Sequence, residues 1–165
     1  EAGSPIRIVE TVIAVNEARK KRMAARILDA LEGNAEGRTV ALLGLTFKPN
    51  TDDMRYSPAL DIVTALTAAG ARVQVFDPQG MAEAKKLMDG VAWCDNAYDA
   101  AEGAEVLAIV TEWNEFRALD LDRVKTLMKR PSMVDLRNIY SPEEVAEAGF
   151  EYRCLGRPTV IRGAG

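Results

Sequence analysis

The sequence contains no histidine and only two cysteines, and none of its apolar runs is as long as a membrane span. Without histidine, most acid–base and nucleophile-activating arrangements cannot be built from this chain alone. Cys94 and Cys154 lie far apart, which favours a reduced, cytoplasmic protein, although one disulfide between them is compatible with the sequence. Because both lie in apolar segments, we expect buried, inert thiols.

Positive charge is also scarce relative to negative charge, since the formal net charge is −4. The chain therefore lacks the basic surface expected of a nucleic-acid-binding protein. No signal peptide is recognisable. We expect no nucleic-acid partner, no membrane partner and no metal site.

The N-terminal segment has the periodicity of one long helix, from about Pro5 to Leu31. Its seam positions recur at alternating spacings of three and four residues, as in a helix that packs on another helix: Ile6, Val9, Ile13, Asn16, Lys20, Met23, Ile27 and Ala30. Such a helix would be about 40 Å long, whereas a domain of this size is about 30–35 Å across. We expect it to project and to meet a partner; the alternative is that it packs flat on its own domain.

After Arg38 the pattern alternates between short apolar strands and helices. This alternation predicts an α/β fold, a Rossmann-like, doubly wound parallel sheet of about six strands preceded by the long helix. The predicted strands are 39–43, 71–76, 91–94, 105–110, 133–136 and 150–155, and the predicted helices are 58–69, 81–88, 97–101, 122–129 and 142–148. We expect residues 156–165 to be disordered.

The loop from Leu43 to Pro58, LGLTFKPNTDDMRYSP, is unusually long for a connection between a strand and a helix. It lacks the glycine fingerprint G-x-G-x-x-G, so a dinucleotide lying across this helix start is not expected. Lys48 and Arg55 are instead suited to phosphate or sugar hydroxyl groups. The competing interpretation is that both cations pair with the neighbouring acids Asp52 and Asp53.

Further polar residues follow other strands at the same predicted edge. Arg137 follows the fifth strand and would converge with Lys48 on an anionic ligand, unless it forms a buried pair with Asp135. Asp77 ends the second strand, where it could bind a ribose, but a turn role before Pro78 is the simpler interpretation. Glu112 could orient a cation or a hydroxyl group, and the neighbouring Trp113 is more typical of packing.

The order of these motifs is similar to that in a known family. The strings GLTFKPNTDDMR, SPAL, FDP, TEWNEF and DLRNIY, preceded by VNEARKKR, resemble the C-terminal part of the UDP-glucose/GDP-mannose dehydrogenase family, and most closely its UDP-glucose branch. The resemblance divides the chain into the end of a central dimerisation helix (residues 1–34), a UDP-binding domain (35–157) and a disordered tail (158–165).

The resemblance also implies functional residues. Lys48 and Arg137 match substrate contacts, and Arg55 matches an arginine that reaches NAD bound mainly by a separate N-terminal domain. The family oxidises UDP-glucose to UDP-glucuronate through a cysteine in the segment FGGSCFPKD, which this sequence lacks. We therefore expect no catalytic residue here, an inactive fragment, and a homodimer or larger assembly formed through the N-terminal helix.

Two alternatives stay open at this point. The domain could serve an enzyme for GDP-mannose or UDP-N-acetylmannosamine, which other members of the family oxidise. It could also be a stand-alone module that binds a nucleotide and dimerises through its helix.

Overall fold

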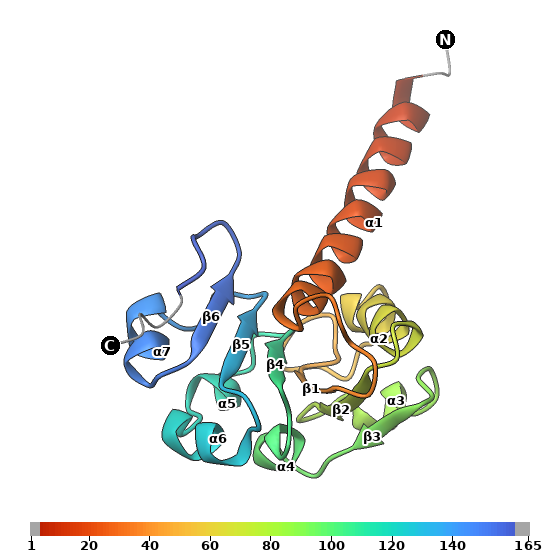
Figure 1. Ribbon diagram of the computed structural model, residues 1–165. Coiled ribbons are helices and arrows are strands. Elements are labelled where there is room, and N and C mark those ends of the chain that lie inside the picture. The colour runs from red at the N-terminus through yellow and green to blue at the C-terminus, as the bar shows by residue number, and fades with distance from the viewer. Residues whose placement is uncertain (1–3, 161–165) are drawn as a thin grey trace.

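The computed structural model describes residues 4–160, whose strands form one parallel sheet in the order β3-β2-β1-β4-β5-β6 (Figure 1). The strands are β1 (Thr39–Leu43), β2 (Arg72–Phe76), β3 (Val91–Trp93), β4 (Val106–Ile109), β5 (Ser132–Asp135) and β6 (Glu151–Cys154). This order is that of a doubly wound fold, in which the chain switches direction across the sheet between β1 and β4. The predicted fold class is confirmed.

Alternation along β1 explains how both faces of the sheet are covered. Val40 and Leu42 point into one core, with α1 (Ser4–Ala30), α2 (Pro58–Ala68) and α3 (Met81–Ala84). Ala41 and Leu43 point into the other core, with α4 (Ala97–Ala101), α5 (Asn114–Arg117), α6 (Leu121–Leu127) and α7 (Pro142–Glu147). The sheet is thus buried on both faces, as parallel sheets require.

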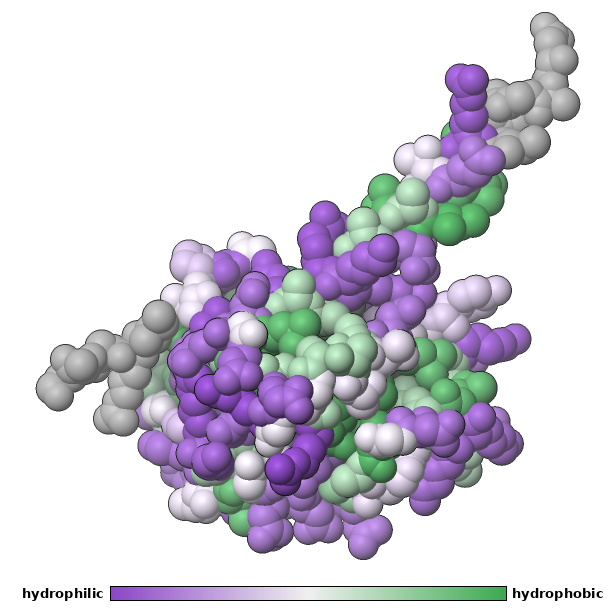
Figure 2. All heavy atoms as spheres, turned by 45° about the vertical axis from the view of Figure 1, so that its right-hand side comes forward, coloured by the Kyte–Doolittle hydropathy of each residue, from purple (hydrophilic) through white to green (hydrophobic). Residues whose placement is uncertain are grey.

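Helix α1 projects well beyond the sheet, as predicted (Figure 1). The burial of its apolar residues changes along the helix. Met23, Ile27 and Ala30, near the C-terminal end, are buried against the sheet. Toward the N-terminus, large apolar side chains are more than half exposed, namely Ile8, Val9, Val12, Ile13 and Val15. Green, apolar atoms accordingly appear on the projecting part in Figure 2. Within residues 4–160, no helix has the length and apolarity needed to cross a bilayer.

Most element boundaries differ from the predictions by one or two residues, and three differences are larger. The helix predicted over 81–88 ends at Ala84, because residues 86 and 87 continue as turns with i→i−3 hydrogen bonds. The single turn α5 was not predicted at all. In the tail, which we predicted to be disordered, Val160 exchanges two backbone hydrogen bonds of 2.9 Å with Tyr152 of β6. Residues 161–165 lie outside the described range.

Candidate functional site

The loop that follows β1 begins with a close approach between two backbones. Gly44 has φ +91°, and a Cβ atom placed there would lie 2.5 Å from the Cβ atom of Thr111, which follows β4. The Thr111 hydroxyl donates a 2.7 Å hydrogen bond to the carbonyl oxygen of Thr46. The loops after β1 and β4 therefore close over the switch point, where doubly wound domains usually bind their ligand.

Asp77 consolidates this closure from the end of β2. Its Oδ2 accepts hydrogen bonds from the backbone N–H groups of Leu45 (2.7 Å) and Thr46 (3.1 Å) and from the indole N–H of Trp113 (3.1 Å). Its Oδ1 accepts from the backbone N–H groups of residues 79 and 80. The whole residue is 1% exposed. Asp77 is thus a turn residue, as the simpler interpretation held, and it also joins three loops instead of facing a ribose.

At the N-terminus of α2, the hydrogen-bonding groups are likewise paired with other groups of the protein. The Ser57 hydroxyl accepts from the N–H of Ala59 (3.2 Å) and donates to the carbonyl oxygen of Leu45 (2.5 Å). Pro58, at the first helical position, has no N–H to offer. With no glycine fingerprint and no available donors, these residues do not fit the pyrophosphate of a dinucleotide such as NAD.

An open crevice lies on the opposite side of this loop, between it and α1. Its volume is about 670 Å³. It is bounded by six residues of α1 (Ile13, Asn16, Glu17, Arg19, Lys20 and Met23), by Phe47, Tyr56 and Pro58, and by Arg137. The crevice therefore combines three cations with two aromatic side chains, whereas one acid lines it.

Arg137 is held in the crevice by the end of β4. Its Nε donates a 2.6 Å hydrogen bond to the carbonyl oxygen of Val110, and the same Nε lies 3.2 Å from Glu112 Oε2. Within residues 4–160, neither terminal nitrogen of the guanidinium has a hydrogen-bond partner. The side chain is 23% exposed and lines the crevice.

Asp135 does not pair with the Arg137 side chain, so the competing interpretation of Arg137 is wrong. The buried Asp135 carboxylate accepts from the backbone N–H groups of Arg137, Ile139 and Tyr140 and from the Tyr152 hydroxyl (2.8 Å). Burial raises the pKa of Tyr152, which keeps this hydroxyl protonated and able to donate. Asp135 therefore shapes the loop that carries Arg137.

Lys48 and Arg55 are arranged differently from Arg137. Lys48 is exposed and is not among the residues that line the crevice, although its neighbour Phe47 is. Arg55 grips Asp53 with two hydrogen bonds, Nε–Oδ1 at 3.0 Å and Nη2–Oδ2 at 2.9 Å. These bonds from Arg55, helped by the charge of Lys48, lower the pKa of Asp53 to about 2. Pairing with a loop acid, which the sequence left open, holds for Arg55.

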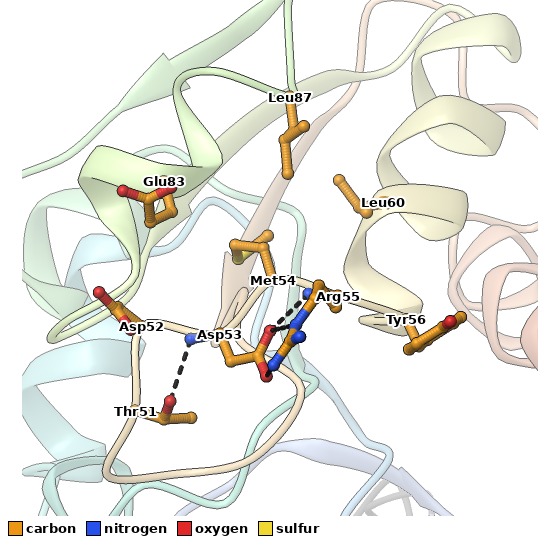
Figure 3. A pocket seen from close by; sticks show the side chains of 9 residues that line it. All are labelled: Thr51, Asp52, Asp53, Met54, Arg55, Tyr56, Leu60, Glu83 and Leu87. Atoms are coloured by element: carbon orange, nitrogen blue, oxygen red, sulfur yellow. Dashed lines mark hydrogen bonds and ion pairs between the residues drawn. The ribbon is translucent and has the colours of Figure 1, made fainter.

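Arg55 lies in a second cavity of about 530 Å³ on the side of the loop that faces α3 (Figure 3). The residues around it are Thr51, Asp52, Asp53, Met54, Arg55, Tyr56, Leu60, Glu83 and Leu87. Tyr56 borders both this cavity and the crevice. The structure therefore separates Arg55 from Arg137 and places Tyr56 between them.

Most residues that line the crevice were not predicted as part of a site, and four of them show why. Phe47 and Tyr56 sit in a loop that was analysed for its charges, and Asn16 and Lys20 were assigned to the packing seam of α1. One signal was available in the sequence, because two polar residues interrupt that apolar seam. Nothing in the sequence indicated that Tyr56 would adopt a positive φ of +59°.

Both thiols have the inert character that we expected. Cys154 is buried and Cys94 partly so, and neither forms a disulfide. Burial raises the pKa of each thiol, which disfavours the reactive thiolate.

A doubly wound parallel sheet with a cation-lined crevice at its carboxyl edge is typical of nucleotide-binding α/β domains. The model of the UDP-glucose/GDP-mannose dehydrogenase family, UDP binding domain, matches residues 41–142, and the chain belongs to this family. The resemblance seen in the motifs is thereby confirmed.

Individual relatives agree with this assignment. The chain is 55% identical over 155 residues to UDP-glucose 6-dehydrogenase of Rhizobium meliloti (strain 1021), which covers 94% of this chain and 36% of the relative. It is 40% identical to UDP-glucose 6-dehydrogenase TuaD of Bacillus subtilis (strain 168), over 96% of this chain and 34% of the relative. The chain thus spans about a third of the length of these curated relatives.

Solved structures give the same result for the fold. A UDP-glucose dehydrogenase from Pyrobaculum islandicum aligns with a TM-score of 0.71 and 31% identity, over 89% of this chain and 32% of that one. A UDP-D-ManNAc dehydrogenase from Pyrococcus horikoshii aligns with a TM-score of 0.65 and 31% identity, over 81% of this chain and 30% of that one.

Proposed function

We propose that this chain is the UDP-sugar-binding domain of an NAD-dependent UDP-glucose 6-dehydrogenase. The observation that carries the proposal is the crevice beside Arg137, where cations and aromatic side chains face one cavity. A UDP-sugar offers a doubly charged pyrophosphate and a planar base, and these groups match guanidinium forks and aromatic walls, respectively. The 55% identity to a UDP-glucose 6-dehydrogenase favours UDP-glucose among the family's substrates.

In this scheme the chain binds and orients substrate but breaks no bond. Arg137 holds the UDP moiety, and Phe47 and Tyr56 flank it. Lys48 does not line the crevice, and its proposed contact with the UDP moiety is what the family resemblance implies; the side chain would reach the ligand from beside Phe47. Restraining the nucleotide places the sugar at the reacting groups, which removes part of the entropic barrier. NAD supplies the hydride acceptor, and because the residues here do not form a dinucleotide cradle, it would bind mainly to another part of the protein. Arg55 is the one cofactor contact that we propose within this chain.

Kinetics of the full-length enzyme test these assignments. Arg137→Ala or Lys48→Ala should raise KM for UDP-glucose about tenfold or more, which is the effect of losing one charged hydrogen bond. The matched control is Lys86→Ala, since Lys86 is exposed, pairs with Glu83 and lines neither cavity. Unchanged KM in both site variants would remove the proposed substrate site. Higher kcat/KM for GDP-mannose or UDP-N-acetylmannosamine would reassign the substrate.

Arg55 is tested separately, because it lies in the other cavity. Arg55→Ala should raise KM for NAD and leave KM for UDP-glucose nearly unchanged. The reverse pattern would make Arg55 a substrate residue, and no change in either constant would leave Arg55 as a partner of Asp53 alone.

We also propose that the exposed apolar face of α1 is covered in the full-length protein, in a homodimer or larger assembly of this cytoplasmic enzyme. Val9 and Ile13, both 57% exposed, belong to the seam that Met23 and Ile27 continue into the core. Sedimentation of the full-length protein should show an oligomer that Val9→Glu with Ile13→Glu dissociates. A wild-type monomer, or an oligomer that survives both changes, contradicts this role.

A further inference from the structure

Residues 111–113, shortly after β4, point in alternating directions. Thr111 and Trp113 are buried and contact the closed side of the loop, where they bond to Thr46 and Asp77. Glu112, between them, must point the other way, as alternate residues of an extended segment do. Its Oε2 is buried, has no hydrogen-bond partner among residues 4–160, and lies 3.2 Å from Arg137 Nε.

The guanidinium of Arg137 is therefore contacted by the protein at its Nε atom and not at its terminal nitrogens. Its Nε donates to the carbonyl oxygen of Val110 at 2.6 Å, and Glu112 Oε2 lies 3.2 Å from the same nitrogen as an ion pair. The backbone of Arg137 is fixed as well, because its N–H donates to Asp135 at 3.0 Å. An arginine held at both its backbone and its Nε has few rotamers left, and its terminal nitrogens remain available for a ligand.

We propose that Glu112 is a positioning residue for substrate binding, whose carboxylate holds the guanidinium of Arg137 in the orientation that grips the UDP-sugar pyrophosphate. This inference rests on the proposed function of Arg137. Fixing the side chain during folding reduces the ordering that binding would otherwise require. Glu112 itself is not among the residues that line the crevice, so it acts through Arg137 and not on the ligand.

A double-mutant cycle in the full-length enzyme tests whether Glu112 acts through Arg137. Glu112→Gln should raise KM for UDP-glucose about five- to tenfold, the effect of weakening one charged interaction, with kcat unchanged. Arg137→Ala removes the guanidinium and its charge and should raise KM by itself. Because the interaction with Glu112 is then already lost, adding Glu112→Gln to Arg137→Ala should raise KM no further.

Two more variants separate positioning from folding. Glu112→Asp keeps the charge on a shorter side chain and should restore part of the affinity. Glu115→Gln, an exposed acid three residues further on, should behave as wild type. Thermal midpoints of all variants identify any change in KM that follows from misfolding.

Several results would overturn the inference. If Glu112→Gln leaves KM unchanged, Glu112 does not position Arg137, and if it lowers KM, the carboxylate competes with the substrate for the guanidinium. If the effects of Glu112→Gln and Arg137→Ala simply multiply, Glu112 acts independently of Arg137. If Arg137→Ala itself leaves KM unchanged, the proposed substrate site fails first, and the role of Glu112 fails with it.

Discussion

The carboxyl edge of the sheet has two halves that use their polar groups in opposite ways. On the β2 side, Asp77 is 1% exposed, and its two oxygens are filled by donors from three loops. On the β5 side, the Nε of Arg137 donates a hydrogen bond to the protein, and the two terminal nitrogens have no hydrogen-bond partner within the described chain. The closed half is built for stability, and the open half keeps its charge for a ligand.

The difference has a simple physical origin. A buried carboxylate is costly unless donors surround it, so a well-satisfied Asp77 implies a rigid structural role. A guanidinium has five donors in a fixed plane, so one edge can be anchored while the rest stays available. Backbone N–H groups that would hold phosphates in a dinucleotide domain are here already donating to Asp77 and Ser57.

The largest expected effect comes from removing the acceptor of the closed half. Asp77→Ala leaves the N–H groups of Leu45, Thr46 and Trp113 buried without a partner and should destabilise this chain by about 3–5 kcal/mol. Arg137→Ala, in the open half, should cost only about 1 kcal/mol. Urea unfolding followed by Trp fluorescence measures both. Equal losses of stability would show that the two halves do not differ as described.

The second effect concerns the loop that carries Arg137. Tyr152→Phe removes the 2.8 Å hydrogen bond to Asp135, which keeps its three backbone donors, and should cost about 1–2 kcal/mol. Tyr56→Phe is the matched control, because Tyr56 is 83% exposed and should tolerate loss of its hydroxyl without a measurable change in urea midpoint. A cost for Tyr152→Phe as small as that of the control would mean that Asp135 does not depend on it.

The third effect isolates backbone strain beside the crevice. Tyr56 has φ +59°, a conformation that costs most non-glycine residues about 1–2 kcal/mol. Tyr56→Gly should therefore be more stable than Tyr56→Ala by about 1 kcal/mol, although both lose the ring. Thermal unfolding of the two variants measures the difference, and a more stable alanine variant would contradict the strain.

The smallest effect is electrostatic and tests the pair in the second cavity. Arg55 holds the pKa of Asp53 at about 2, so the carboxylate should stay ionised as pH falls through 4. Any stability that this pair adds is present above pH 4 and is lost as pH falls toward 2, because a lowered folded-state pKa favours the folded protein only where the group is ionised. Arg55→Gln should return the NMR titration midpoint of Asp53 toward 3.8. An unchanged midpoint would mean that the pair does not form in solution.

The fold was largely predictable because local patterns decide it. Alternating strands and helices, Ser57 and Pro58 at the start of α2, and the seam of α1 are short-range signals, and the structure agrees with each. The site was predictable only in part. Arg137 and Glu112 could both be placed at the sheet edge from strand order, and Glu112 was a candidate to orient a cation. That Arg137 is this cation, and that it also bonds to Val110, could not be predicted, because both contacts join residues more than twenty positions apart in sequence. Whether Arg55 pairs with Asp53 depends on loop geometry that sequence does not encode locally.

One titration tests the central claim most directly, that the open half of the edge binds the UDP moiety. This chain should be titrated with UDP and, separately, with NAD, and followed through its backbone amide NMR signals. We predict that UDP binds with an affinity of about millimolar and shifts the signals of residues 47, 56 and 137, that Arg137→Ala abolishes these shifts, and that NAD produces none. Shifts with NAD alone, or UDP shifts that persist in Arg137→Ala, would contradict the account.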